Sequence, residues 1–154
     1  MKIACIGTGF VGVVTAAVFA KLGHEVVGLD IDEAKITQLK AGKVPFYEPG
    51  LPELLVSTQQ AGKLIFTTDY AQSIPHAEVI FVIVGTPSLP DGQADLQYVF
   101  RAIESLAPHL TDGAVVAIKS TVPPGTNTKI AEQIRSHTQV NFELASTPEF
   151  LKEG

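Results

Sequence analysis

The sequence predicts an α/β fold, in which about six parallel strands form one doubly wound sheet with helices on both faces. Short apolar runs rich in Val and Ile alternate with longer amphipathic runs, as strands and crossover helices do in parallel sheets. A glycine-rich turn follows the first apolar run directly. The length of 154 residues is that of one ordinary domain, so we expect residues 1–154 to form a single domain.

Each strand is expected where a short apolar run ends at turn residues, and the unbroken apolar character indicates burial on both faces. The six expected strands are Lys2–Ile6, Val26–Asp30, Leu64–Thr67, Val79–Val84, Ala114–Lys119 and Phe142–Ala145. The expected helices between them are Phe10–Leu22, Asp32–Ala41, Leu51–Gln60, Asp95–Leu110 and Thr126–Arg135. Gly23, Gly42 and Gly62 end the first three helices, and Asp32 and Asp95 are the expected N-caps.

The composition excludes several functional classes. A net charge of −5 gives no basic surface for nucleic acid. No apolar run approaches the roughly 18 residues of a membrane helix, and no secretory signal precedes the first strand, so we expect a cytoplasmic protein without a membrane partner. Cys5, the single cysteine, lies inside a strand and is expected to be a buried apolar residue. The histidines are too scattered to predict a metal site.

The strongest motif is "GTGFVG", which runs from Gly7 through Phe10 to Gly12 between the first strand and the first helix. Gly7 permits a tight turn, Gly9 lets a pyrophosphate approach the backbone, and Gly12 allows close packing of the helix. Free N–H groups at the start of a helix attract phosphates. An acidic chain can therefore bind a dinucleotide through local geometry.

Asp30 strengthens this interpretation. It ends the second strand, 18 residues after Gly12, close to the spacing of about 20 for a carboxylate that binds the adenosine ribose. A carboxylate there repels a 2′-phosphate, so NAD is the expected cofactor. The alternative, a simple turn with Asp30 helping to cap the next helix, is less consistent with strand, spacing and acid together. We therefore expect a Rossmann-type sheet in the strand order 3-2-1-4-5-6.

Three further strand ends are expected to meet the glycine loop at one crevice. Thr86 follows the fourth strand and can offer a hydroxyl to the cofactor, although "GTP" could equally be a strand-ending turn. Thr121 follows the fifth strand. After the sixth, Glu149 and Glu153 stand four positions apart on one helix face. By spacing alone, these two acids could equally be catalytic or favour a helix dipole.

Several segments together resemble the UDP-glucose/GDP-mannose dehydrogenase family, in its N-terminal NAD-binding domain. They are "MKIACIGTGFVG", "VVGLDID", "YEPGL", "VGTPSLPDGQADL", "KSTVPPGT" and "TPEFLKEG". The resemblance covers the whole chain. It implies an NAD-dependent, two-step oxidation of the primary alcohol of a nucleotide sugar to the acid, through an aldehyde and a cysteine-bound thioester. Within the family we expect UDP-glucose, oxidised to UDP-glucuronate with two NAD, and a homodimeric full-length enzyme.

The resemblance also implies roles for individual residues. Glu149 and Thr121 are similar to the residues around the water that hydrolyses the thioester, and Glu153 to a glutamate near cofactor and substrate. The positions that resemble cofactor contacts are Val11, Asp30, Lys35, Thr86 and Thr121. The catalytic cysteine, a lysine and the sugar-nucleotide contacts of the family lie in later regions. We therefore expect this chain to bind NAD without turnover.

Alternative functions remain at this point. The substrate could be GDP-mannose or an N-acetylated UDP-sugar, because the contacts that distinguish them lie beyond Gly154. A 3-hydroxyacid or 6-phosphogluconate-type dehydrogenase has a similar opening, but many of these carry an arginine where this chain has Asp30. A non-enzymatic NAD-sensing module would need neither "STVPPGT" nor "PEFLKEG".

Overall fold

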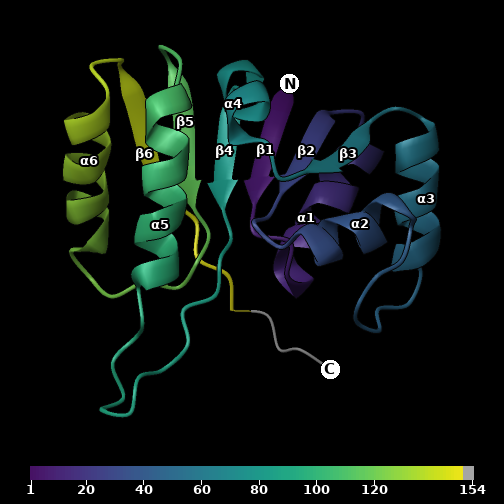
Figure 1. The fold of residues 1–154 in the computed structure, drawn as a ribbon, viewed down its shortest axis with the longest axis horizontal. Helices are drawn as coiled ribbons and strands as arrows, with labels where there is room; N and C mark the ends of the chain where they lie inside the picture. Colours follow the sequence, from purple (N-terminus) through teal and green to yellow (C-terminus); the bar gives the residue numbers. More distant parts are fainter. Residues whose placement is uncertain (151–154) are drawn as a thin grey trace.

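The computed structural model describes residues 1–150 and contains one parallel sheet. Its strands lie in the order β3-β2-β1-β4-β5-β6, so the expected order, direction and fold class are confirmed (Figure 1). The strands are β1 (Lys2–Ile6), β2 (Glu25–Leu29), β3 (Leu64–Thr67), β4 (Val79–Val82), β5 (Ala114–Ile118) and β6 (Phe142–Ser146). Their ends differ from the expected ones by at most two residues.

The five expected helices are present. They are α1 (Phe10–Lys21), α2 (Glu33–Lys40), α3 (Leu51–Gln60), α5 (Gln97–Leu106) and α6 (Thr126–His137). Asp32 caps α2 as expected, because its carboxylate accepts a hydrogen bond from the Lys35 amide. At α5 the expectation was wrong by one residue: Leu96 occupies the cap position, and Asp95 accepts from the Gln97 amide.

The sequence analysis missed one short helical segment between β3 and β4. It consists of α4 (Tyr70–Ser73) and the 3₁₀ turn η1 (Ile74–His76), and Asp69 caps it by accepting from the Gln72 amide. Four residues are too few to show a helical apolar period. The helix expected to reach Leu110 also ends early, at Leu106, and continues as the 3₁₀ turn η2 (Ala107–His109), which contains Pro108.

Two apolar cores cover the two faces of the sheet, with α1, α2 and α3 on one face and α4, α5 and α6 on the other. Strand β1 contributes to both, since successive side chains of a strand point to opposite faces. Ile3 and Cys5 pack with the α1 side, whereas Ala4 and Ile6 pack with the α5 side. The central strand is therefore buried on both faces, as its unbroken apolar run predicted.

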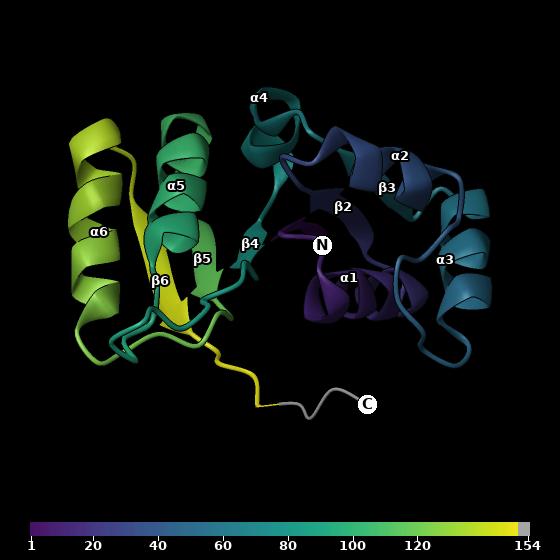
Figure 2. The ribbon, with the colours of Figure 1, turned by 60° about the horizontal axis from the view of Figure 1, so that its bottom comes forward.

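Strand register determines which residues emerge together at the carboxyl edge of the sheet, which Figure 2 brings forward. Ile6 is paired with Leu29 on one side and with Val82 on the other. Val82 is in turn aligned with Ile118, and Ile118 with Ser146. The segments that follow these five residues therefore start side by side, and they contain every site residue expected from the sequence except Glu153, which lies outside the described residues.

Candidate functional site

The loop between β1 and α1 has a geometry that requires glycine at two positions. Gly7 has a φ of +97°, and a Cβ added there would lie 2.4 Å from the backbone oxygen of Ile83. A Cβ on Gly12 would lie 1.9 Å from the backbone oxygen of Gly7. These are the tight turn and the close packing that the motif predicts. The partner of Gly12 is the loop itself rather than a strand.

Gly9 differs from both, because a Cβ added there would meet nothing within 4 Å. Gly9 is the N-cap of α1, and the first-turn amides of Phe10, Val11 and Gly12 have no partner within the helix. The fold therefore leaves open space in front of free N–H donors, as a bound phosphate requires. The side chains of Phe10 and Val11 turn elsewhere: the Phe10 ring packs edge-on against Phe46 at 5.1 Å, and Val11 packs against the core on the α1 side.

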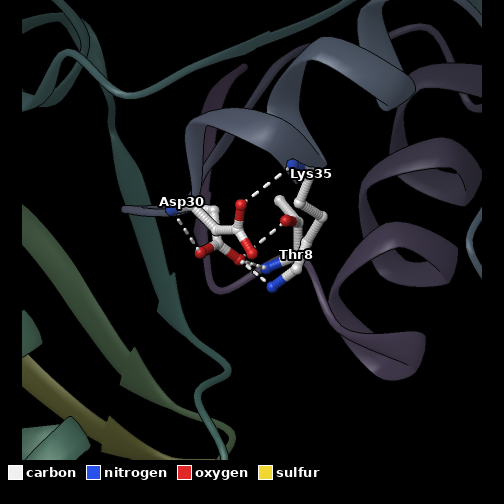
Figure 3. A network of polar contacts seen from close by, with 4 residues as sticks. Thr8, Asp30 and Lys35 are labelled. Atoms are coloured by element: carbon white, nitrogen blue, oxygen red, sulfur yellow. Dashed lines mark hydrogen bonds and ion pairs between the residues drawn. The ribbon is translucent and has the colours of Figure 1, made fainter.

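Asp30 lies beside this loop in a network of polar contacts (Figure 3). One carboxylate oxygen, Oδ2, accepts hydrogen bonds from the Thr8 amide at 2.9 Å and the Thr8 hydroxyl at 2.7 Å. Lys35 Nζ donates to the same oxygen at 3.0 Å, and the Asp32 amide donates to Oδ1 at 3.1 Å. Burial alone would raise the pKa of Asp30, but the hydrogen bonds from Thr8, Lys35 and Asp32 outweigh it and hold the pKa below its ordinary value. Asp30 is therefore an ionised, firmly placed acceptor.

A cleft of about 540 Å³ opens between the glycine loop and α5. That volume falls within the range of small-molecule and cofactor sites. Its walls include three of the residues predicted to contact the cofactor, Gly9, Asp30 and Lys35. They also include three residues that the sequence analysis did not select, Tyr70, Tyr98 and Arg101. Burial, and secondarily the charge of Asp30, raises the pKa of Tyr70 to about 12, so its hydroxyl stays protonated. No local motif identifies these side chains, because they come from α4 and α5.

Thr86, Thr121 and Glu149 form a second group, joined by hydrogen bonds along the same sheet edge but outside the walls of the cleft. The Thr86 hydroxyl donates to the backbone oxygen of Thr121 at 3.0 Å. The Thr121 hydroxyl donates to the backbone oxygen of Glu149 at 3.3 Å. The chain segments after β4, β5 and β6 are thus connected in series at the sheet edge, but these three residues do not line the cleft beside the glycine loop, so the expectation of one shared crevice is not confirmed.

Lys119 belongs to this group, although the sequence analysis did not select it. Its ammonium lies 2.9 Å from Glu149 Oε2, and the Phe150 amide donates to Oε1 at 2.9 Å. The hydrogen bond from Lys119 is the main reason why the pKa of Glu149 lies below its ordinary value. Lys119 follows an apolar run and opens the "KSTVPPGT" segment, but neither signal identifies a partner 30 residues away.

Other expectations concern groups outside these clusters. Cys5 is fully buried, and burial raises the pKa of its thiol to about 12. His24 and His109 are half-buried. Within residues 1–150 no three His, Cys, Asp or Glu side chains converge as metal ligands would. None of the helices in that range combines the length and the apolar character needed to span a membrane.

Comparison with known proteins gives consistent matches over the chain. Residues 1–154 match the model of the UDP-glucose/GDP-mannose dehydrogenase family, NAD binding domain. A UDP-glucose 6-dehydrogenase of Rhizobium meliloti is 45% identical over 100% of this chain and 36% of its own length. The structure of a UDP-glucose dehydrogenase from Pyrobaculum islandicum matches 99% of the chain and 37% of that protein, with 40% identity and a TM-score of 0.91. A GDP-mannose dehydrogenase from Pseudomonas aeruginosa, solved as a ternary complex, matches over the same shares, with 35% identity and a TM-score of 0.94. The chain thus spans little more than a third of the length of these relatives.

Proposed function

The chain belongs to the UDP-glucose/GDP-mannose dehydrogenase family as its NAD-binding domain, and from that premise we propose that it is the cofactor half of an enzyme that oxidises UDP-glucose. The reaction would convert the C6 alcohol to the carboxylate of UDP-glucuronate with two NAD. The observation that carries the cofactor assignment is the ionised carboxylate of Asp30, fixed by Thr8 beside the open space at Gly9.

The cleft has the parts that NAD requires. Free amides at the start of α1 would bind the pyrophosphate, and Gly9 leaves room for it. Among residues 1–150, Asp30 Oδ1 accepts one hydrogen bond, so it has capacity left for a ribose hydroxyl. NAD, when bound, supplies the acceptor for hydride. Lys35 would remain close to the ribose because it is paired with Asp30.

Glu149 and Thr121 would act on the water that hydrolyses the thioester. A carboxylate and a hydroxyl at one sheet edge can orient a water and accept its proton. The support is that the hydrogen bond from Thr121 to the Glu149 backbone brings the two together. We propose Glu153 for the region near cofactor and substrate by resemblance alone, and Thr86 as a further cofactor contact.

Cys5 does not fit the role of the nucleophile that forms the thioester. The nucleophile must be an accessible thiolate, whereas Cys5 is fully buried and its pKa is about 12. A cysteine from outside these residues would have to supply that step. We therefore propose that this chain binds NAD but does not catalyse the oxidation by itself. Separately, we propose that the natural protein containing it is a cytoplasmic homodimer.

UDP-glucose is the proposed substrate because the relatives named for it are 45% and 40% identical to the chain. GDP-mannose is the second candidate, since the GDP-mannose dehydrogenase has the higher TM-score of the two structures, 0.94 against 0.91. The test is formation of NADH by the natural protein with each sugar. Two NADH per UDP-glucose support the proposal, and oxidation of GDP-mannose alone would replace it.

Cofactor binding is tested on this chain by calorimetric titration with NAD⁺ and, separately, with NADP⁺. We expect saturable binding of NAD⁺ and clearly weaker binding of NADP⁺, because Asp30 repels a 2′-phosphate. Equal affinity for both would contradict the assigned role of Asp30. A folded chain that binds neither would contradict the proposed site.

A further inference from the structure

We propose that Lys119 is a positioning residue for Glu149: its ammonium fixes the direction of the Glu149 carboxylate that acts on water. This inference rests on the proposed function, because it assigns Glu149 to that water. The inference extends the proposed function by giving a role to Lys119, a residue that lies in the "KSTVPPGT" segment but to which the sequence analysis assigned no role.

The backbone of Lys119 is anchored on the neighbouring strand. Its amide donates to the Val82 backbone oxygen at 2.9 Å, and the Ser120 amide donates to the same oxygen at 3.1 Å. The Ser120 hydroxyl, which is buried, also donates to the Val84 backbone oxygen at 2.7 Å. The same hydroxyl lies 3.4 Å from the Val82 backbone oxygen, so four hydrogen bonds join the residues after β5 to the end of β4 and its following loop, and the Lys119 side chain starts from a fixed point.

Glu149 is placed almost as firmly. The Thr147 amide continues the pairing of β6 with β5 by donating to the Ile118 backbone oxygen at 2.8 Å. Two residues later, the Glu149 backbone oxygen accepts from the Thr121 hydroxyl. Backbone contacts thus bring Glu149 next to Lys119, and the ion pair of 2.9 Å then selects the direction of the side chain.

The environment makes this pair more than a solvent-exposed contact. The Lys119 side chain is only 16% exposed and that of Glu149 is 32% exposed. Among the charged groups of residues 1–150, Lys119 is the one that lies within ion-pair distance of Glu149. The attraction between the two charges would become stronger once ligands cover the sheet edge, because charges interact more strongly as water is excluded.

The chemical consequence concerns both oxygens of Glu149. Lys119 binds Oε2 and the Phe150 amide binds Oε1, so each oxygen keeps a lone pair in a fixed direction for a water. The carboxylate is ionised at neutral pH, as a proton acceptor must be. Without Lys119 the carboxylate would still be ionised at neutral pH, but Oε2 would lose the group that fixes its direction, and the side chain would adopt other rotamers.

The first experiment uses this chain. The variants are Lys119→Met, Lys119→Arg, which keeps the charge, and Lys129→Met, a control at an exposed lysine of α6. Carbon-detected NMR of labelled glutamate carboxylates follows the titration of Glu149, with Glu149→Gln to assign its signal. We expect an upward shift of the Glu149 pKa in Lys119→Met, a much smaller one in Lys119→Arg and none in Lys129→Met. An unchanged titration in Lys119→Met, with urea unfolding that shows a folded chain, would overturn the proposal.

The second experiment uses the natural protein that contains the chain, with kcat measured against pH. Misplacing a reacting group by about 1 Å lowers rates up to roughly a hundredfold, so we expect Lys119→Met to lower kcat by about ten- to a hundredfold and to move the acidic limb to higher pH. Lys119→Arg should return the acidic limb of the pH profile of kcat to its position in the unmodified protein. If Glu149→Gln lowers kcat but Lys119→Met leaves rate and profile unchanged, the positioning role fails and the proposed function stands. If Glu149→Gln has no effect, the proposed role of Glu149 fails first.

Discussion

The two glycines Gly9 and Gly12 separate cofactor binding from folding, and substitution of each by alanine tests this separation. At Gly9 the φ of −72° suits alanine, and the added Cβ meets nothing within 4 Å. Exchange of glycine for alanine at an N-cap costs about 0.5–1 kcal/mol. We therefore expect Gly9→Ala to remain folded, with only a slightly lower free energy of unfolding.

Cofactor binding should respond in the opposite way. The methyl group of Gly9→Ala would occupy the space in front of the free amides of α1, where the pyrophosphate is expected. Loss of that close approach should weaken NAD⁺ binding at least tenfold, which corresponds to about 1.4 kcal/mol.

Gly12→Ala should show the reverse pattern. Alanine in a helix gains about 1 kcal/mol over glycine, but here its Cβ would lie 1.9 Å from the Gly7 backbone oxygen. A backbone group must move, and overpacking of this kind costs about 1–3 kcal/mol or more. Because the obstructing atom belongs to the backbone, we expect the upper end of that cost, about 3 kcal/mol, and hence a net loss of about 2 kcal/mol out of a typical total of about 5–15 kcal/mol.

Urea unfolding and calorimetric titration of both variants measure the two quantities separately. The reasoning would be refuted if Gly9→Ala bound NAD⁺ as tightly as the unmodified chain, or if Gly12→Ala were equally stable. Gly9→Ala that failed to fold would also refute it, because the structure shows open space at that position.

Three further predictions follow from Asp30 and Cys5. Asp30→Asn should weaken NAD⁺ binding about tenfold and improve NADP⁺ relative to NAD⁺, because it removes the repelling charge and leaves Lys35 unpaired; competitive titration measures both, and an unchanged preference would contradict it. The pKa of Asp30 is lower in the folded chain than in the unfolded chain. The stability that Asp30 contributes is therefore complete above the unfolded pKa of about 3.9 and is lost as pH falls through the folded pKa. Urea unfolding midpoints measured from about pH 5 to pH 3 should fall less steeply in Asp30→Asn than in the unmodified chain. Burial raises the pKa of Cys5 to about 12 in the folded chain, so the free energy of unfolding decreases as pH rises above the unfolded pKa of about 8.5, by up to about 1.4 kcal/mol per pH unit. Between about pH 8.5 and pH 10, the free energy of unfolding should therefore decrease less in Cys5→Ala than in the unmodified chain. Equal slopes of this free energy against pH in the two proteins would contradict the prediction.

The sequence predicted those parts of the fold and site that depend on local spacing. Gly7, Gly12 and Asp30 could be found because strand, turn and helix follow one another within a short segment, and each role depends on that order. The strand order could be predicted because the glycine motif and Asp30 mark the dinucleotide-binding fold, in which the strands lie in the order 3-2-1-4-5-6.

What the sequence did not reveal depends on contacts between distant segments. Lys119 meets Glu149 only because β5 and β6 are paired in one particular register. Tyr70 lines the cleft from a helix too short to have a recognisable period. Thr8 stands at a variable position of the glycine motif, yet its two donors fix Asp30. Side-chain partners of this kind require the folded arrangement, since neither residue alone carries a signal.

The contact of Thr8 with Asp30 also has a kinetic and thermodynamic consequence. Thr8 is 1% exposed, and its amide and hydroxyl both donate to Asp30, so contacts within the chain itself tie the glycine loop to the end of β2. A dinucleotide arriving at such a preorganised loop has little backbone motion to arrest, and the entropic penalty of binding falls mainly on the ligand. Association should then be limited by orientation of the incoming dinucleotide, and differences in affinity between variants of the loop should reside mainly in the dissociation rate.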